Sequence, residues 1–433
     1  MTKPLNGDSI MTTNSTNAQT NISQLADTLT KNPMLNELIS SSDVKSYLVN
    51  GMSNLISKAC DIERNMYLQD NTEDAGNGYL PERNIMLGTT AVPISTPRTR
   101  SGGFYPTFLP KYQRVLPQDY EHMLRDILLN SSNFANVKRM LGALNLPYQP
   151  QQLDTIINEI HQQAKHYFQR RLDPDWYFLY IDAKNIDLAD ENKKINKAVI
   201  FTVVGIDTNC KRHILSIQLF WGNESLDLWK KVFIDLKNRG LTRPLTLITD
   251  GFSGITGLTQ SLFPDSFHQL CIVHLKRNAF KHLCKDQYQA FMIAIDELSL
   301  SPNQAVANPI FTAACDAFKN DHAHYAKHLL ARVDFYTNFT HFPRDLRPHI
   351  HATNPVEGFN NATEIIQRNA GGHFHSEREV LVKLKIKADQ LIAKKWRSPI
   401  PKIKHHIHDI SNLFIQTFEA SFQDDSFFNT QHS

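Results

Sequence analysis

Three acidic residues lie where the chain passes from one predicted element to the next: Asp182, Asp250 and Glu357. Asp182 follows the apolar run 176–181, which has the composition of a buried strand, and Asp250 follows a second apolar run, 245–249. Glu357 lies in the first turn of a predicted helix. Because neighbouring strands of an open α/β sheet end at one edge, we expect the three carboxylates to meet there.

A cluster of carboxylates is unfavourable unless a cation neutralises it, and oxygen ligands favour a hard divalent cation such as Mg²⁺. Mg²⁺ takes few protein ligands and leaves coordination positions for phosphate oxygens. Two such ions about 3.5–4 Å apart activate an attacking oxygen and stabilise a leaving one. The three acidic residues therefore predict a site for two Mg²⁺ ions, with Mn²⁺ as the expected substitute.

Each acidic residue also has an interpretation without chemistry. Asp182 could be a solvated residue at a strand end, and Asp250 could form a turn with the glycine that follows it. Glu357 could belong to a capping box, with Asn354 as the N-cap and Pro355 at the first helical position. A carboxylate at that place can cap a helix and bind a metal at once.

The elements that must position these residues follow from the apolar pattern. Three strand-like segments come first, then a helix closed by Gly240, a strand, a helix and a strand. This order predicts an α/β sheet with a leading meander. The predicted strands are 176–183, 197–206, 213–219, 245–249 and 267–273, and the predicted helices are 225–239 and 255–263.

The flanking segments are mainly helical in pattern. Residues 1–32 have the composition of a disordered segment, and 69–79 form a polar break. Two β-like runs, 84–88 and 90–95, predict a hairpin that leads into a basic loop. The predicted helices are two short ones within 34–68, then 119–129, 133–144 and 149–171, a helical stretch over 275–345, and helices at 376–396 and 403–422.

Composition limits the class of protein. The chain has 433 residues, 41% of them hydrophobic, and a formal net charge of +3, which is typical of a multidomain globular protein. Five unevenly spaced cysteines indicate reduced thiols in the cytoplasm. No signal-peptide pattern and no apolar run of about 20 residues is evident, so no membrane association is expected.

One segment is strongly basic. Residues 368–408 contain ten Lys/Arg and five histidines against three acidic residues, which favours either a polyanionic partner or a solvated helix face. The helices within 118–171 permit a helix-turn-helix-like DNA-binding module, and a plain helical bundle is the alternative. Trp229 and Trp396 lie on apolar helical faces and are expected in the core.

A series of motifs occurs in one order along the chain: Gly222–Ser225, Asp235–Leu241, Asp250-Gly251, Phe263-Pro264, Gln269–His274, Arg277-Asn278 and Thr353–Asn360. Together they resemble the Mutator-type bacterial insertion-sequence transposases of the DDE class. Arg98–Phe104 and Leu109–Arg114 are similar to the segment that precedes the DNA-binding helices in that family. The resemblance covers about residues 80–395.

The resemblance implies an RNase H-like mixed sheet flanked by helices and interrupted by an all-helical insertion. It assigns Asp182, Asp250 and Glu357 to the acidic triad, and Cys271-x-x-His274 to the family's C-x2-H signature. The implied domains are a disordered 1–32, helices and a hairpin in 33–115, a DNA-binding region in 116–172, a catalytic domain in 174–375 with its insertion at about 280–345, and basic helices and a tail in 376–433.

The implied activity is metal-dependent hydrolysis of a phosphodiester at a transposon end, followed by attack of the freed 3′-hydroxyl on target DNA. The implied partners are double-stranded DNA, as terminal inverted repeats and as target, and a second copy of the chain; the expected location is the bacterial cytoplasm, at the nucleoid. A catalytically silent DNA-binding protein and a nuclease without strand transfer remain alternatives.

Further residues are expected near the active site or on DNA. Cys271, His274 and Asn354 are expected beside the triad; a zinc site of Cys271 and His274 with His282 and Cys284 is disfavoured, since helical residues two apart face different sides. The basic residues expected to contact DNA are Arg98, Arg100, Lys111, Arg114, Lys138, Arg139, Arg277, Lys394 and Lys395.

Overall fold

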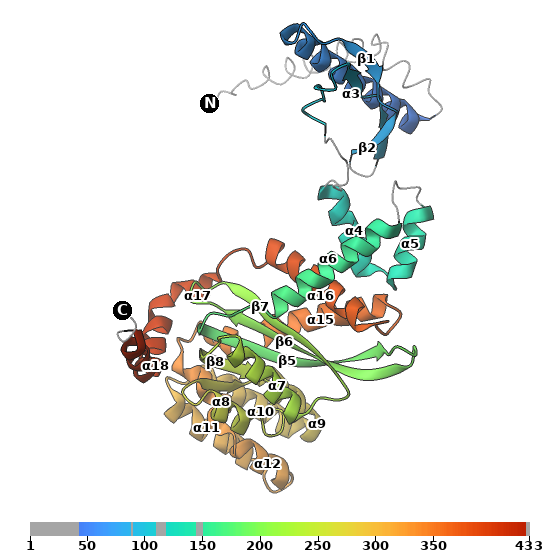
Figure 1. The fold of residues 1–433 in the computed structure, drawn as a ribbon. Helices are drawn as coiled ribbons and strands as arrows, with labels where there is room; N and C mark the ends of the chain where they lie inside the picture. Colours follow the sequence, from blue (N-terminus) through green and yellow to red (C-terminus); the bar gives the residue numbers. More distant parts are fainter. Residues whose placement is uncertain (1–42, 88–89, 110–117, 144–149, 430–433) are drawn as a thin grey trace, which may run out of the picture. The chain divides into compact units, whose positions relative to one another are not determined.

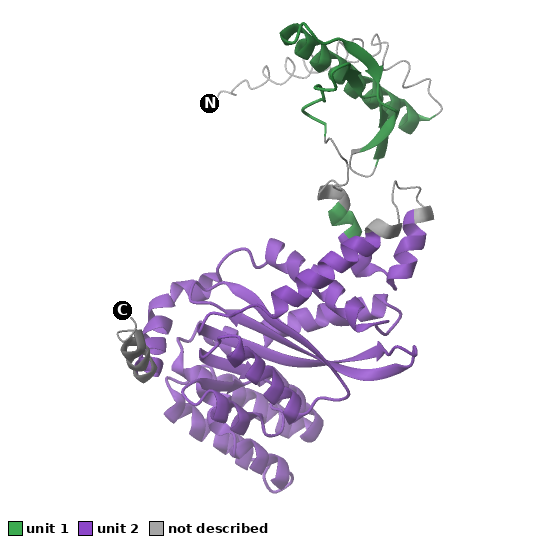
Figure 2. Cartoon of the chain, viewed as in Figure 1, with its two compact units in different colours: residues 1–124, 143–147 green, residues 125–142, 148–433 purple. Residues whose placement is uncertain are grey.

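The structure is a computed structural model that describes residues 43–87, 90–109, 118–143 and 150–429 (Figure 1). The chain divides into two compact units (Figure 2): residues 1–124 with 143–147, and residues 125–142 with 148–433. The predicted disorder of residues 1–32 lies outside the described residues. The domain boundaries predicted from the sequence stay predictions.

Unit 1 is built on one long helix, α3 (Val44–Asp70), packed over two small antiparallel pairs of strands. The predicted hairpin is confirmed as β2 (Arg83–Leu87) paired with β3 (Thr90–Ile94). The side chains of Cys60, Ile85, Val92, Ile94 and Leu109 form a core between helix and strands. Its Asp43 side chain caps α3 by accepting hydrogen bonds from two backbone amides of the first turn.

Of the two short helices predicted over 34–68, residues 34–42 lie outside the described residues. From Val44 one helix continues to Asp70, through the turn-favouring pair Asn50-Gly51. One prediction for unit 1 was wrong. The predicted polar break and basic loop pair with each other as strands, β1 (Gly76–Tyr79) and β4 (Pro97–Thr99). All four residues of β1 are exposed, so this pairing left no apolar pattern in the sequence.

The three helices predicted over 119–171 are confirmed as α4 (Gln118–Asn130), α5 (Phe134–Ala143) and α6 (Pro150–Phe168). Helix α6 packs against α16 (Glu377–Lys394) and the nearby strand β7 (Arg212–Trp221). This packing accounts for the buried face of α6, which includes Leu153, Ile157 and Ile160.

A five-stranded mixed sheet forms the centre of unit 2 (Figure 1). Its strands are β5 (Asp175–Ala189), β6 (Ile195–Ile206), β7, β8 (Arg243–Thr249) and β9 (Phe267–Leu270), and their order is β7-β6-β5-β8-β9. Strands β5, β6 and β7 form an antiparallel meander, and β8 and β9 run parallel to β5. The α/β class and the leading meander are thus confirmed, with α7 (Leu226–Asn238) and α8 (Ile255–Leu262) where helices were predicted.

Two strands differ from their predicted extents. Strand β5 does not end near Asp182 but continues to Ala189, paired with β6 in a long antiparallel arm. Within this arm Asp187 is neutralised by Lys197 at 2.7 Å, and Asp190 accepts backbone hydrogen bonds that close the turn. Strand β9 stops at Leu270 instead of Val273, because Ile272 begins helix α9 (Ile272–His282).

The stretch predicted to be helical, 275–345, is described throughout; it consists of helices joined by turns and contains no strand. It contains α9, α10 (Lys285–Leu298), α11 (Gln304–Asp316), α12 (Ala323–Leu330), α13 (Val333–Thr337), a 3₁₀ turn (Asn338–His341) and α14 (Arg347–Ile350). Helix α15 (Asn354–Asn369) follows and packs on β5 and β6. No described helix is long and apolar enough to cross a bilayer.

The basic segment is partly internal. In α16, Lys383 is fully buried, pairs with Glu379 at 2.8 Å and donates to the carbonyl of Ser131. Lys385 is also buried and pairs with Asp389. These charges are neutralised inside the unit, so the charge run is less available to a partner than its sequence indicated. The chain ends in α17 (Pro401–His405) and α18 (Ile407–Asn429), and the expected burial of Trp229 and Trp396 is confirmed.

Candidate active site

The strand register brings Asp182 and Asp250 together. Ile181 of β5 pairs with Thr249 of the parallel strand β8, so the residues that follow them lie side by side on neighbouring strands. Adjacent strands are about 4.8 Å apart. Asp250 follows its strand as predicted, whereas Asp182 is an interior residue of β5 and is only 9% exposed. The prediction that Asp182 ends its strand was wrong, although the register puts Asp182 beside the end of the strand that Asp250 follows.

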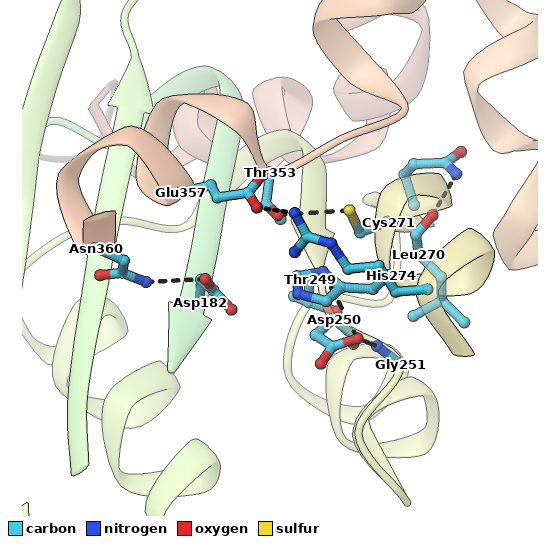
Figure 3. Close-up of polar contacts among 12 residues, drawn as sticks. Asp182, Thr249, Asp250, Gly251, Leu270, Cys271, His274, Thr353, Glu357 and Asn360 are labelled. Atoms are coloured by element: carbon cyan, nitrogen blue, oxygen red, sulfur yellow. Dashed lines mark hydrogen bonds and ion pairs between the residues drawn. The ribbon is translucent and has the colours of Figure 1, made fainter. Parts of the chain in front are cut away.

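Helix α15 contributes Glu357 and Asn360, which lie on one helical face because they are three residues apart. Asn360 is buried and donates from Nδ2 to Oδ2 of Asp182 at 2.8 Å, while its Oδ1 lies 3.4 Å from the hydroxyl of Thr202 (Figure 3). The amide is therefore held between two strands, and it fixes the orientation of the Asp182 carboxylate.

Glu357 forms an ion pair with Arg277 of α9. Figure 3 shows its carboxylate directed toward the side of the site where Cys271 and His274 lie. The capping-box interpretation was wrong, because α15 begins at Asn354, its N-cap is Thr353, and no side chain caps it by a hydrogen bond. Asn354 itself is exposed in the first turn, on the same helix as Glu357.

Cys271 and His274 lie at the start of α9, directly after the last strand. The His274 Nδ1 atom is 3.8 Å from Oδ1 of Asp250, and the hydroxyl of Thr353 lies 3.4 Å from the buried Cys271 sulfur. Burial disfavours the imidazolium, but Cys271 and the carboxylates of Asp250 and Asp182 outweigh it and raise the pKa of His274 to about 9. A positive charge at His274 is therefore expected beside the two aspartates.

Burial dominates the electrostatics of Asp182. It raises the pKa of that carboxyl, and the negative charge of Asp250 acts in the same direction, while His274 and the Asn360 hydrogen bond oppose both. A fourth acid, Glu224, lies within electrostatic reach: burial raises its pKa first, and the charges of Asp250 and Asp182 raise it further. The Glu224 carboxylate accepts a hydrogen bond from the Trp229 indole at 2.8 Å.

The carboxylate oxygens of Asp182, Asp250 and Glu357 are ligands that suit a hard cation, but the three groups do not converge on one position. Among the described residues, no three His, Cys, Asp or Glu side chains are close enough to hold a metal ion. Glu357 is turned to Arg277, and one oxygen of Asp182 is occupied by Asn360. Asp250 and the second Asp182 oxygen remain as hard oxygen donors, and Glu357 could join them once released from Arg277, so the residues fit Mg²⁺. The disfavoured zinc site is likewise not assembled within this part of the chain.

Three contributions were missed by sequence reasoning. Asn360 was named only within a motif, although its spacing of three from Glu357 puts it on the same face. Arg277 was expected on DNA, and its pairing with Glu357 across 80 positions of sequence has no local signal. Glu224 precedes the N-cap Ser225 and was likewise named only within a motif, Gly222–Ser225.

The other basic residues expected to contact DNA are dispersed. Arg98 and Arg100 are exposed in unit 1, and Lys394 and Lys395 are exposed at the end of α16. In α5, Lys138 pairs with Asp154 at 2.6 Å, and Arg139 contacts Asn136. Lys111 and Arg114 lie outside the described residues.

Comparison with known proteins gives a consistent family. The sequence profile of the family described as "Transposase, Mutator family" matches residues 12–396. The chain is 27% identical over 281 residues to a protein of Corynebacterium diphtheriae named "Probable transposase for insertion sequence element", covering 64% of this chain and 80% of that protein. It is 23% identical over 305 residues to the "Transposase for insertion sequence element IS1201" of Lactobacillus helveticus, covering 69% and 80%.

One solved structure is also similar over much of its length. It is titled "Drosophila P element transposase strand transfer complex", with 10% identity and a TM-score of 0.27, covering 71% of this chain and 92% of that chain. Similarity at that level carries no argument about this fold, which rests on its own strand order and register.

Proposed function

The chain belongs to the Mutator family of transposases, and we propose that it is a DDE transposase of an insertion sequence that cuts and joins DNA with Mg²⁺. One observation carries the proposal: Asp182 of β5 lies beside the end of the parallel strand β8, which Asp250 follows, and Asn360, on the same helical face as Glu357, donates a hydrogen bond to Asp182. The sheet order β7-β6-β5-β8-β9 supports the further proposal that this core is RNase H-like.

Asp182, Asp250 and Glu357 would hold the metal. When bound, Mg²⁺ neutralises the carboxylates, lowers the pKa of an attacking water and stabilises charge on phosphate oxygens. Asn360 keeps Asp182 in one orientation, and the His274 charge lowers the repulsion between the two aspartates before DNA arrives. Arg277 neutralises Glu357 in the same way and, being 55% exposed on its side chain, can turn to a DNA phosphate when Glu357 is needed.

The proposed reaction has two steps at one site. Water attacks the phosphodiester at the transposon end and releases a 3′-hydroxyl, which then attacks a phosphodiester of target DNA and joins the two. The protein contributes positioning and fixed charge, whose loss costs about 10²–10³ in rate per group. Because the substrate is DNA, we expect the protein to act in the bacterial cytoplasm, at the nucleoid.

Two copies of the chain are expected to act together, since two transposon ends must be joined, and α3 offers a surface for this. Apolar residues follow one another at alternating spacings of four and three along its exposed side, which is the pattern of a coiled-coil seam. Leu55 is 71% exposed, and both Ile62 and Met66 are 61% exposed. The residues of this α3 stripe are Leu48, Met52, Leu55, Ala59, Ile62 and Met66.

The partner that fits the α3 stripe is a helix with the same spacing. The α3 helix of a second copy of the chain has the same sequence and therefore the same spacing. The proposal is therefore a homodimer formed through two copies of this helix. The side of α3 that carries Cys60 and Ile56 packs on the strands of its own unit. The stripe lies on a different side of the helix and is not used in that packing.

The test is cleavage and joining by the purified chain on DNA that carries the element's terminal sequences. With Mg²⁺ we expect nicked ends and then joined products; with Ca²⁺ or EDTA we expect binding without either. Glu357→Gln should bind DNA and produce neither product. Nicks without joined products would favour the nuclease alternative, and binding without any cleavage would favour a silent DNA-binding protein.

A further inference from the structure

A cavity of about 570 Å³ lies among the helices that follow β9 in unit 2. It is lined by α9 and by residues 321–328, most of which belong to α12. Four imidazoles face it: His282, His322, His324 and His328. The volume lies in the range of sites that enclose a nucleotide-sized ligand.

A stack of three aromatic rings ends at this cavity. Phe318 is stacked on Tyr325 with ring centres 6.0 Å apart, and Tyr325 is stacked on His282 at 4.5 Å with an interplanar angle of 25°. Phe318 is buried, whereas His282 is exposed. The outer imidazole therefore offers a flat face on which a further ring can continue the stack, as nucleic-acid bases do on aromatic side chains.

The polar groups of the cavity suit the edges of a base. The Asn278 amide can donate and accept at once, which is the pairing that adenine presents. The Tyr325 hydroxyl is buried and makes no hydrogen bond with any described residue. The acid of the lining, Asp321, accepts a hydrogen bond from the Gln287 amide at 2.6 Å, which fixes the orientation of its carboxylate.

Two links join the cavity to the proposed active site. Along α9, His274, Asn278 and His282 are four residues apart and share one face, which spans about 12 Å from His274, beside Asp250, to the ring stack at His282. Arg332 forms the second link, since its Nη1 lies 3.0 Å from the carbonyl of Gly251 and 3.0 Å from Nε2 of His328.

We propose that this cavity binds an unpaired nucleotide of the DNA strand at the active site, about three nucleotides from the bond that is cut. The distance follows from 12 Å at about 3.4 Å per nucleotide of a stacked strand. The base stacks on His282, its edge meets Asn278, and the intervening phosphates pass the exposed cations Arg277 and Lys281 of α9. This inference rests on the proposed function, because it takes the strand from the same active site.

A transition metal is the other ligand that four imidazoles suggest. Within the described residues, however, no three of the imidazoles and acids gather closely enough to hold an ion. A metal site would also leave the stacked rings and the Asn278 amide without a role in binding the ligand. The nucleotide is therefore the better match to what lines the cavity.

The test uses the full chain with Asp250→Asn, so that DNA stays uncut, and duplexes of the terminal sequence that are blunt or carry three unpaired nucleotides. The third unpaired position holds 2-aminopurine, whose fluorescence falls when it stacks. We expect quenching and about tenfold tighter binding of the extended duplex, as stacking of one base provides. Adding Asn278→Ala with His282→Ala should abolish both effects and leave blunt-duplex affinity unchanged, while His408→Ala, an exposed histidine of α18, should change neither.

Two outcomes would overturn the cavity assignment. Equal loss of affinity for blunt and extended duplexes would make the cavity a general phosphate contact, and tight Zn²⁺ binding abolished by the same double variant would make it a metal site. Failure of the proposed function looks different: the wild-type chain would then fail to cut either duplex in Mg²⁺, whatever its 2-aminopurine signal.

Discussion

At the scale of residues, the Asp182 carboxylate is nearly buried, and the groups around it offset part of the cost of that burial. Asn360 donates a hydrogen bond to it at 2.8 Å. The positive charge of His274 attracts both the Asp182 and the Asp250 carboxylates. A buried charge of this kind is retained where its chemistry is required. Without metal, these two neighbours and Arg277 supply the compensation that a cation would give.

The sequence singled out Asp182 and Asp250 because each follows an apolar run, and Glu357 because it lies in the first turn of a predicted helix. Their partners were harder to predict. Asn360 is three residues from Glu357, a spacing that puts both on one face of a helix. Arg277 belongs to a different helix, and only tertiary packing brings it to Glu357. Contacts of the second kind have no local pattern, so Arg277 was assigned to DNA.

Arg277→Met should strengthen metal binding in the absence of DNA. The ion pair competes with a cation for Glu357, and its loss should raise Mn²⁺ affinity about fivefold, the scale of one exposed ion pair. Free Mn²⁺ measured by electron paramagnetic resonance gives the affinity. Lys276→Met is the matched control, since Lys276 pairs with Asp296 and its loss should change nothing. Equal Mn²⁺ affinity in the two variants would count against competition at Glu357.

A second prediction concerns His268, which is 2% exposed beside the catalytic edge and lies 2.8 Å from the hydroxyl of Thr249. Burial, aided by Arg332, lowers the pKa of His268 to about 3. Since this is below the unfolded value of about 6.5, stability is full above pH 6.5 and falls as the pH drops toward 3.

His268→Gln should remove that dependence. From pH 6.5 to 5.5, the free energy of unfolding of the wild type should fall by about 1 kcal/mol more than that of the variant. Urea unfolding at both pH values measures it. The same fall in both proteins would show that His268 does not stay neutral.

At the scale of elements, the sequence predicted the succession of strands and helices along the chain but not the residues at which β5 and β9 end. Ile186 and Leu188 are buried and alternate with polar residues, so the extension of β5 had a signal that the charges around it obscured. Strand β1 had none, because all four of its residues are exposed and its pairing with β4 depends on long-range backbone hydrogen bonds. The start of α15 was misplaced by one residue because the capping box was a plausible local alternative.

Helix α16 provides an element-scale prediction. Lys383→Met leaves the buried Glu379 carboxylate without its cation and the Ser131 carbonyl without its donor. Breaking a buried pair costs about 3–5 kcal/mol, so the urea midpoint should fall steeply. Lys387→Met on the same helix, which is half-exposed, should change stability by about 0.5 kcal/mol or less. Similar effects of both would contradict the role given to the buried pair.

At the scale of the whole molecule, the proposed chemistry is confined to unit 2, while unit 1 carries the α3 stripe and two of the exposed arginines expected on DNA. Such a division gives pairing and cutting to different parts of one chain. Cutting requires the carboxylates at the sheet edge, and pairing requires only an apolar helical face that a second copy can cover.

Leu55→Glu with Ile62→Glu should therefore convert a dimer into a monomer. Two buried charges facing each other across a seam are strongly unfavourable, so light scattering after size exclusion should show half the mass. Asn54→Glu adds one negative charge to the same helix outside the stripe and should remain dimeric. A wild-type chain that is monomeric at micromolar concentration would refute pairing through α3.

The most direct measurement of the central claim is cleavage of a labelled terminal duplex in Mg²⁺ by two matched variants, Asp250→Asn and Asp265→Asn. Asp250 follows β8 at the proposed catalytic edge, whereas Asp265 is exposed in the turn before β9, at the opposite end of the sheet. Both variants should bind the duplex like the wild type. We predict at least 10²-fold slower cleavage by Asp250→Asn and an unchanged rate for Asp265→Asn; cleavage by Asp250→Asn at the wild-type rate would contradict the assignment.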